Sequence, residues 1–354
     1  MPVHLYTKSG VEQTRKVMLF VLGLVSSGLA EGGPASAAPG ELLPADVPPS
    51  TNALPVPARR AAVIALNFAP RPVQNGYEAQ LALARQGISP GSLDGVIGPQ
   101  TRAALRAFQE KEGLPMTGQL DPVTKARLIL TESPERIYTV TGNDLARLLP
   151  VGATWLAKSQ QERLDFETIL ELLAERGQAS QNLIRLLNPS IDWANVTAGT
   201  SVVIPNVPLP PVRAKAETVR IRLSERILQA FDERNALLAH FPCSIARQLE
   251  KRPMGELFVE KIAGYPTYRF DPENFPESAE ARRLGRILDI APGPNNPVGT
   301  AWIGLNLPGY GIHGSPRPEE VGRTESHGCF RLANWNAEYL AQLVRVGTRV
   351  IVEP

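Results

Sequence analysis

The chain has 354 residues, more than one hydrophobic core usually supports, so we expect two or three domains. Its 37 basic and 35 acidic residues give a net charge of +2, which excludes a large single-sign field for capturing nucleic acid or lying on an anionic membrane. The 33 Pro and 29 Gly residues predict that part of the chain is linker or loop.

The N-terminus has the features of an export signal. Two basic residues at 15–16 precede the apolar run 17–30, which is short for a membrane span. Small residues suited to cleavage follow, so we predict a signal peptide over residues 1–37, with an uncleaved membrane anchor as the alternative. Residues 38–72 are rich in Pro and Ala, which predicts an extended tether.

Residues 73–132 predict three short helices with turns between them. Asp121 and Pro122 are typical of the N-cap and the first position of the third helix. The order of these features, above all DGVIGPQTRAALRAFQ, resembles the peptidoglycan-binding domain that lies beside many cell-wall enzymes. The resemblance implies a small all-α module that binds the wall and does not catalyse a reaction. A structural spacer with the same fold is the alternative.

Residues 137–206 resemble a LysM-like module, in which two short strands flank two helices. The strand patterns are YTVTGNDL and TSVVIPN, and helical stretches at 169–173 and 183–187 lie between them. The segment between Asp144 and Phe166 interrupts the usual step from strand to helix. We therefore expect an α+β spacer or interdomain support in place of a glycan-binding module.

Residues 218–354 have the period of β-strands and predict a β-rich sandwich or barrel-like domain. One amphipathic helix is predicted at 334–347, with Asn334 as its cap and Gly347 at its end. Cys243 falls in a strand pattern and is expected to be half-buried. Because Cys329 is the only other cysteine and has a different expected role, both are predicted to be unpaired thiols.

The segment HGSPRPEEVGRTESHGCF gathers two histidines and one cysteine. A zinc site needs three or four ligands, and His313, His327 and Cys329 have no CxxC partner or helically spaced acidic ligand, so no metal is expected. The segment is too polar and turn-rich for a core. A free thiol is mostly protonated at neutral pH and an imidazole can take its proton, so a cysteine nucleophile with a histidine base fits best. Backbone amides at Gly328 and Cys329 are candidates for holding an oxyanion.

The longer segment YGIHGSPRPEEVGRTESHGCFRLANWNAEYLAQLV closely resembles the catalytic motif of YkuD-type L,D-transpeptidases. The resemblance extends over residues 218–354 and makes Cys329 the nucleophile and His313 its general acid and base, oriented by the Gly314 carbonyl. His327 lies two residues before Cys329, on the same side of an extended segment. It stays open as a supporting or oxyanion-side residue, or as the proton carrier itself.

Four further residues are assigned to the substrate side of the site. Arg331 resembles the arginine that meets a carboxylate of the peptide, with a surface salt bridge as its alternative. Ser326 is expected to form local hydrogen bonds, Asn334 to frame the site, and Tyr310 to contact substrate. Asn336 stands where the family often has an acidic residue, and no function is assigned to it.

The resemblance implies an enzyme of the periplasm or cell wall that needs no cofactor. It would transfer an acyl group from a peptidoglycan tetrapeptide stem to an amine and release D-alanine. The acceptor stays open: another stem, an outer-membrane lipoprotein, or water, which would make the protein an L,D-carboxypeptidase. A non-catalytic wall-binding scaffold is the alternative of another class.

Overall fold

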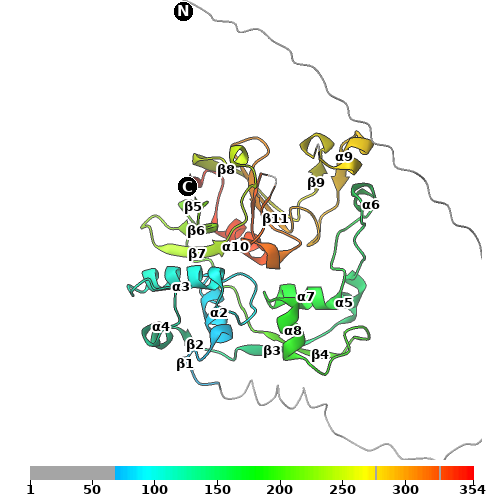
Figure 1. Cartoon of the computed structure of the whole chain (residues 1–354). Coiled ribbons are helices and arrows are strands. Elements are labelled where there is room, and N and C mark those ends of the chain that lie inside the picture. Colours follow the sequence, from blue (N-terminus) through cyan, green and yellow to red (C-terminus); the bar gives the residue numbers. More distant parts are fainter. Residues whose placement is uncertain (1–67, 276, 327) are drawn as a thin grey trace, which may run out of the picture. The chain divides into compact units, whose positions relative to one another are not determined.

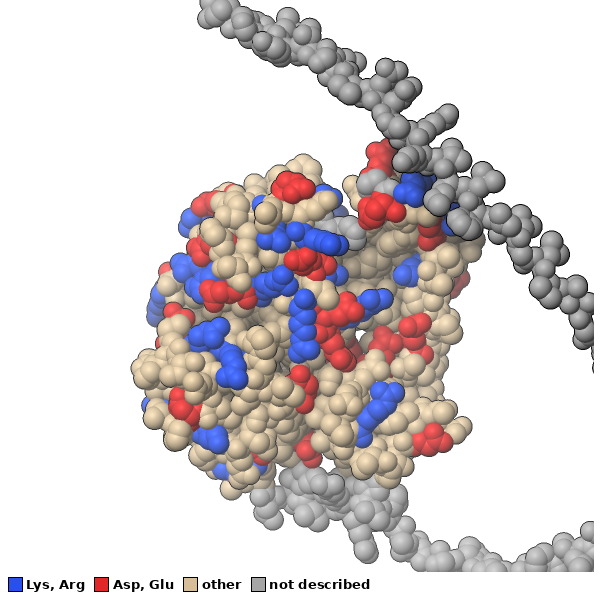
Figure 2. Space-filling model, viewed as in Figure 1, with Lys and Arg blue, Asp and Glu red and all other residues tan. Residues whose placement is uncertain are grey.

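The computed structural model describes residues 68–275, 277–326 and 328–354 (Figure 1). The predicted signal peptide and nearly all of the tether lie outside these residues, and so does His327. In the described part of the chain no helix is long and apolar enough to cross a membrane. Figure 2 shows Lys and Arg side chains next to Asp and Glu side chains over the visible face.

The N-terminal module is helical, as predicted. Its elements are β1 (Arg71–Pro72), α2 (Gly76–Ala84), α3 (Pro99–Lys111), α4 (Pro122–Arg127) and β2 (Ile129–Leu130). Asp121 is the N-cap of α4 and accepts a hydrogen bond from the Thr124 amide, with Pro122 at the first helical position, which confirms that prediction. Leu81 and Phe108 are buried where α2 and α3 meet.

The middle module has two antiparallel strands with helices between them. Its elements are β3 (Glu135–Thr139), α5 (Gly142–Arg147), α6 (Trp155–Ser159), α7 (Ile169–Arg176), α8 (Gln181–Leu187) and β4 (Ser201–Pro205). The predicted helical stretches are α7 and α8. The segment that interrupts the sequence pattern contains α6, and residues 148–166 are called the inserted segment below.

The C-terminal domain is β-rich, as predicted. Eight strands form one sheet in the order β13-β12-β11-β8-β14-β5-β6-β7. Their bounds are β5 (Thr218–Arg222), β6 (Ile227–Phe231), β7 (Leu237–Pro242), β8 (Gly255–Gly264), β11 (Ala301–Leu305), β12 (Gly311–His313), β13 (Phe330–Arg331) and β14 (Arg349–Glu353). A separate two-stranded sheet consists of β9 (Tyr268–Phe270) and β10 (Leu288–Ile290), with α9 (Ala279–Leu284) between them.

The C-terminal helix α10 (Asn334–Leu343) differs at both ends from its prediction. Ala333 is the N-cap and makes no side-chain cap, so the expected capping by Asn334 is wrong. The Asn334 side chain is buried and bonds to the 294–300 loop instead, where it satisfies backbone groups that water cannot reach. The helix ends at Leu343, before Gly347, which has a φ of 89° in the following turn.

The N-terminal module contacts the outer edge of the large sheet. Ile88 forms a parallel bridge with His240 of β7, and the Ser89 amide donates to the His240 carbonyl at 2.8 Å. Asn336 of α10 donates from Nδ2 to Ser89 Oγ at 3.0 Å. Asn336, which had no assigned role, therefore joins the C-terminal domain to the N-terminal module.

Candidate active site

Three neighbouring strands bring predicted site residues onto one face of the sheet. His313 pairs with Trp302 across β11–β12 and with Arg331 across β12–β13. Directly paired residues project to the same side of a sheet, so these three side chains share a face. On each strand the adjacent residue points to the opposite face and is buried in the core: Ile303, Ile312 and Phe330.

Cys329 immediately precedes β13 and lies two residues before Arg331. Its Sγ is 3.4 Å from the Gly309 carbonyl oxygen, and its thiol also interacts with the backbone of Gly311, two residues before His313. The thiol therefore lies at the end of the strand pair that carries His313. Burial raises the pKa of the Cys329 thiol, and the Gly311 backbone contact opposes that rise. At neutral pH this cysteine rests in its protonated form.

Cys243 has a different environment. It lies just beyond β7 and is fully buried, so the expected half-buried strand position is wrong. Burial raises its pKa to about 12. Both cysteines are free, which confirms that they are unpaired thiols.

His313 is buried and held in one orientation. Its ring stacks on Trp302 with centroids 5.6 Å apart, and Nδ1 lies 2.7 Å from the Gly314 carbonyl oxygen. A carbonyl only accepts hydrogen bonds, so Nδ1 carries the proton and Nε2 is left with a free lone pair. Burial lowers the pKa of His313 to about 4, although the Gly314 contact acts in the opposite direction. The imidazole is neutral at pH 7.

Gly314 is packed where no side chain fits. A Cβ there would collide with Asn334 Oδ1 and would lie 3.1 Å from the Thr300 backbone nitrogen. Asn334 in turn accepts from the Thr300 amide at 3.3 Å and donates to the Pro294 carbonyl at 3.2 Å. Asn334 therefore packs against Gly314, the residue whose carbonyl orients His313.

Ser326 closes the turn that presents the thiol. Its hydroxyl donates to the Cys329 carbonyl at 2.6 Å and accepts from the Gly328 amide at 3.3 Å. Its own amide donates to the Ile245 carbonyl at 2.8 Å. The hydroxyl is thus used inside the turn, as expected for a local hydrogen-bonding residue.

Gly328 has no close neighbour beyond its own chain segment in the described residues. A Cβ at Gly328 would meet no atom of the described residues within 4 Å, and its φ is not in the left-handed region. The open space beside it faces no packed neighbour in the described chain.

Arg331 is half-buried and makes no ion pair with any described residue. Its Nη2 donates to the Glu325 carbonyl at 2.6 Å and to Thr324 Oγ1 at 3.2 Å, while its buried Nε has no partner in the described chain. The salt-bridge alternative is thus not seen among these residues. A guanidinium with an unused donor suits a carboxylate ligand. Tyr310 lies nearby in sequence, in the β11–β12 turn beside Gly309.

Sequence reasoning missed two aromatic residues of the site. The ring of Trp302 stacks on His313. A predicted β-hairpin with its turn at Pro308-Gly309 would have paired Trp302 with His313. Tyr268 of β9 interacts electrostatically with Cys329, and its pKa is raised to about 12, mainly by burial. Nothing in the local sequence signals this second contact, because β9 lies in a separate sheet.

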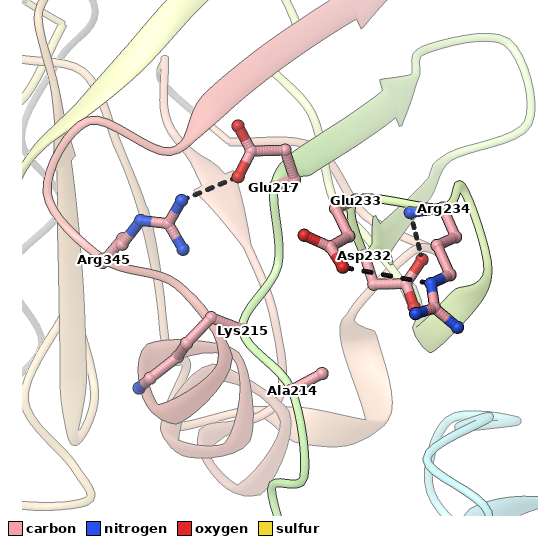
Figure 3. A pocket seen from close by; sticks show the side chains of 7 residues that line it. All are labelled: Ala214, Lys215, Glu217, Asp232, Glu233, Arg234 and Arg345. Carbon is pink, nitrogen blue, oxygen red and sulfur yellow. Dashed lines mark hydrogen bonds and ion pairs between the residues drawn. The ribbon is translucent and has the colours of Figure 1, made fainter.

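A cavity of about 390 Å³ lies elsewhere in the C-terminal domain (Figure 3). It opens beside β5. Strands β11, β8 and β14 lie between β5 and β12 in the sheet. Two ion pairs join its charged side chains, Arg345 with Glu217 at 2.7 Å and Arg234 with Glu233 at 3.9 Å. Its lining contains neither cysteine nor histidine: Ala214, Lys215, Glu217, Asp232, Glu233, Arg234 and Arg345. Among the described residues no group of three or more His, Cys, Asp and Glu side chains is placed to hold a metal ion.

A thiol and a neutral, oriented imidazole on adjoining strands are the groups that thiol-dependent acyl-transfer enzymes use. Comparison with known proteins agrees with that class. Residues 216–352 match the family model described as "L,D-transpeptidase catalytic domain", and residues 74–128 match "Putative peptidoglycan binding domain". Residues 216–352 therefore form an L,D-transpeptidase catalytic domain, and a domain that matches peptidoglycan-binding domains precedes it.

The chain is similar to two curated relatives and to a solved structure with such names. The "Putative L,D-transpeptidase YkuD" of Bacillus licheniformis is 29% identical over 191 residues, which cover 53% of this chain and 94% of the relative. The "Probable L,D-transpeptidase YbiS" of Escherichia coli is 29% identical over 186 residues, or 51% of this chain and 58% of the relative. The structure of L,D-transpeptidase 3 from Mycobacterium tuberculosis with a faropenem-derived adduct is 15% identical, covers 45% of this chain and 76% of that one, and has a TM-score of 0.32.

Proposed function

We propose that this enzyme transfers an acyl group from a peptidoglycan tetrapeptide stem to an amine, with Cys329 as the nucleophile. The observation that carries the proposal is the pairing of His313 with Arg331 on adjoining strands, with Cys329 immediately before β13 and its thiol against the backbone at the start of β12. The family assignment supplies the substrate class, peptidoglycan, and the peptidoglycan-binding domain supports it. Export to the periplasm or cell wall follows from that substrate and from the signal-like segment 1–37.

The first half-reaction begins from a neutral pair, because burial keeps the thiol protonated and the imidazole unprotonated. Cys329 Sγ attacks the stem carbonyl while its proton moves to His313 Nε2, so no charged resting pair is needed. The Gly314 carbonyl accepts from Nδ1 throughout and stabilises the imidazolium as it forms. That imidazolium then protonates the departing amine, the carbon–nitrogen bond breaks, and D-alanine leaves a thioester on Cys329.

The second half-reaction reverses these proton movements. An acceptor amine attacks the thioester carbonyl, His313 Nε2 takes its proton, and the carbon–sulfur bond breaks as the thiol regains that proton. Backbone amides near Gly328 and Cys329 are the proposed oxyanion donors, with the open side of Gly328 left for the substrate. His327 remains the alternative proton carrier.

Arg331 is proposed to bind a carboxylate of the stem peptide. We expect Arg331→Lys to raise KM for a disaccharide-tetrapeptide by about tenfold with a smaller change in kcat, because lysine keeps the charge but loses the forked donors. Steady-state kinetics of D-alanine release measure both constants. The matched control is Arg317→Lys, since Arg317 is exposed and paired with Glu320. Equal KM values for the two variants would contradict the assignment.

Mass spectrometry tests the proposed reaction. The protein is incubated with disaccharide-tetrapeptide, with and without a soluble amine, and both the products and the Cys329 peptide are analysed. We expect D-alanine release, a thioester on Cys329, and a new amide product when the amine is present. Hydrolysed tripeptide as the sole product would assign the L,D-carboxypeptidase activity. Absence of both D-alanine release and thioester would favour the wall-binding scaffold.

A further inference from the structure

The inserted segment of the middle module packs against the β9–β10 arm of the catalytic domain (Figure 1). The arm is defined as residues 265–275 and 277–300. The ring of Trp155, at the start of α6, stacks on Phe270 with centroids 4.2 Å apart and an interplanar angle of 18°. Phe275 and Tyr268 flank the same ring at 5.7 and 6.1 Å. One aromatic cluster therefore joins two parts of the chain that are far apart in sequence.

Backbone hydrogen bonds join the same two segments. The Leu164 amide donates to the Pro292 carbonyl at 2.9 Å, and the Asn295 amide donates to the Leu164 carbonyl at 3.0 Å. Gly293, with a φ of 147°, leaves no space for a side chain because a Cβ would collide with the Leu164 carbonyl. Leu164 is fully buried in the small core of the arm. The loop after β10 is therefore shaped to receive the inserted segment.

A carboxylate adds a third connection. Glu280 of α9 accepts hydrogen bonds from the Trp155 amide at 2.7 Å and from the Leu156 amide at 3.4 Å. These amides begin a short helix and have no partner within it. Glu280 thus satisfies the start of α6 and fixes α9 against it.

The arm connects directly to the candidate active site at its base. The Tyr265 amide donates to the Thr300 carbonyl at 2.7 Å, and the Gly314 amide donates to the Ala301 carbonyl at 3.1 Å. The residue after Ala301 is Trp302, whose ring stacks on that of His313. At the other end, Tyr268 is close enough to Cys329 for the thiol to affect its titration. A shift of the arm would therefore alter the surroundings of both the thiol and the histidine.

We infer that the inserted segment is a built-in support that holds the β9–β10 arm against the thiol, with Trp155 as its positioning residue. The middle module then serves the active site through its inserted segment, which explains why that segment departs from the LysM-like pattern. Trp155 touches no reacting atom and acts through Phe270 and Tyr268. The effect on turnover rests on the proposed function, whereas the position of the arm can be measured without turnover.

Alkylation of Cys329 tests the position of the arm. Wild-type protein and Trp155→Ala are treated with iodoacetamide over a range of pH, and the Cys329 peptide is quantified by mass spectrometry. We expect the high-pH limiting rate to rise by about tenfold in Trp155→Ala, because loss of a large, partly buried ring that packs on the arm favours local opening of the arm. Trp155→Phe should restore the slow rate, since its ring can still stack on Phe270. A wild-type rate in folded Trp155→Ala would overturn the inference.

Two further variants separate the support from general destabilisation. Trp193→Ala removes a tryptophan of the same module that packs in the other core, so it should leave Cys329 alkylation unchanged. Glu280→Ala should raise the rate of Cys329 alkylation by about threefold. If Trp155→Ala does not fold, this variant tests whether the inserted segment holds the arm. In turnover, Trp155→Ala should raise KM for the tetrapeptide more than it lowers kcat. If wild-type protein releases no D-alanine, the proposed function fails, but the alkylation rates still test the support.

Discussion

Cys329→Ala is expected to lower the rate of D-alanine release from a disaccharide-tetrapeptide by at least about 10⁴-fold. The reason is that without the Cys329 sulfur there is no thioester intermediate, and the other cysteine, Cys243, is fully buried. Because Cys329 is only partly buried and lies in the turn before β13, the substitution should leave the fold intact. Release of D-alanine followed by mass spectrometry, with circular dichroism of both proteins, measures the effect.

Cys243→Ala is the matched control for this experiment. Cys243 is fully buried, and its raised pKa keeps it protonated, so it cannot act as a nucleophile near neutral pH. We expect kcat to change less than about twofold, with a loss of about 1 kcal/mol of stability for the small cavity. Equal activity of Cys329→Ala and wild type would exclude the proposed nucleophile. A large loss in Cys243→Ala alone would transfer that role to the buried thiol.

His313→Ala is expected to lower kcat/KM by about 10³-fold, the usual range for a lost general base. In wild-type protein, kcat/KM should fall on the acid side with a midpoint near pH 4, because burial lowers the pKa of His313 to about 4. The neutral imidazole is the base, so activity is present above this pKa and is lost as pH falls through it. A pH–rate profile between pH 3 and 8 measures the midpoint.

His327→Ala decides between the two histidines. If His313 is the proton carrier, the fall of kcat/KM at low pH keeps its midpoint near pH 4 in His327→Ala. If the fall of kcat/KM at low pH disappears only in His327→Ala, His327 is the proton carrier. A midpoint near the ordinary histidine value would contradict the buried, neutral state of His313.

Stability also falls as pH drops from about 6.5 towards 4, because the unfolded chain binds protons at its histidines before the native state does. The rates must therefore be taken where circular dichroism shows folded protein.

The helices of the N-terminal module could be predicted from sequence because their signals are local. Asp121 and Pro122 act on the residues that follow them, and the same contacts appear in the structure. Asn334 shows the limit of this approach. It stands where a cap is expected, but loop atoms from residues 294 and 300 compete for its side chain, and burial makes those bonds the better choice.

The candidate site could be predicted in part for the same reason. Cys329 and His313 are conspicuous because cysteine and histidine are scarce in this chain. The i, i+2 spacing of Cys329 and Arg331 predicts that their side chains lie on the same side of an extended segment. Trp302 and Tyr268 were not found, because their places depend on strand pairing and on a second sheet.

By itself, the sequence indicated the class of chemistry, since a thiol and an imidazole come from residue types, and the resemblance to L,D-transpeptidases added a proposed carboxylate-binding role for Arg331. It also determined the order of the modules, through patterns that extend over a few residues. Only the tertiary structure decided that His313 is neutral, because its low pKa comes from burial under neighbouring elements. Only the tertiary structure showed that the inserted segment meets the β9–β10 arm, because Trp155 and Phe270 come together through folding and have no shared local signal.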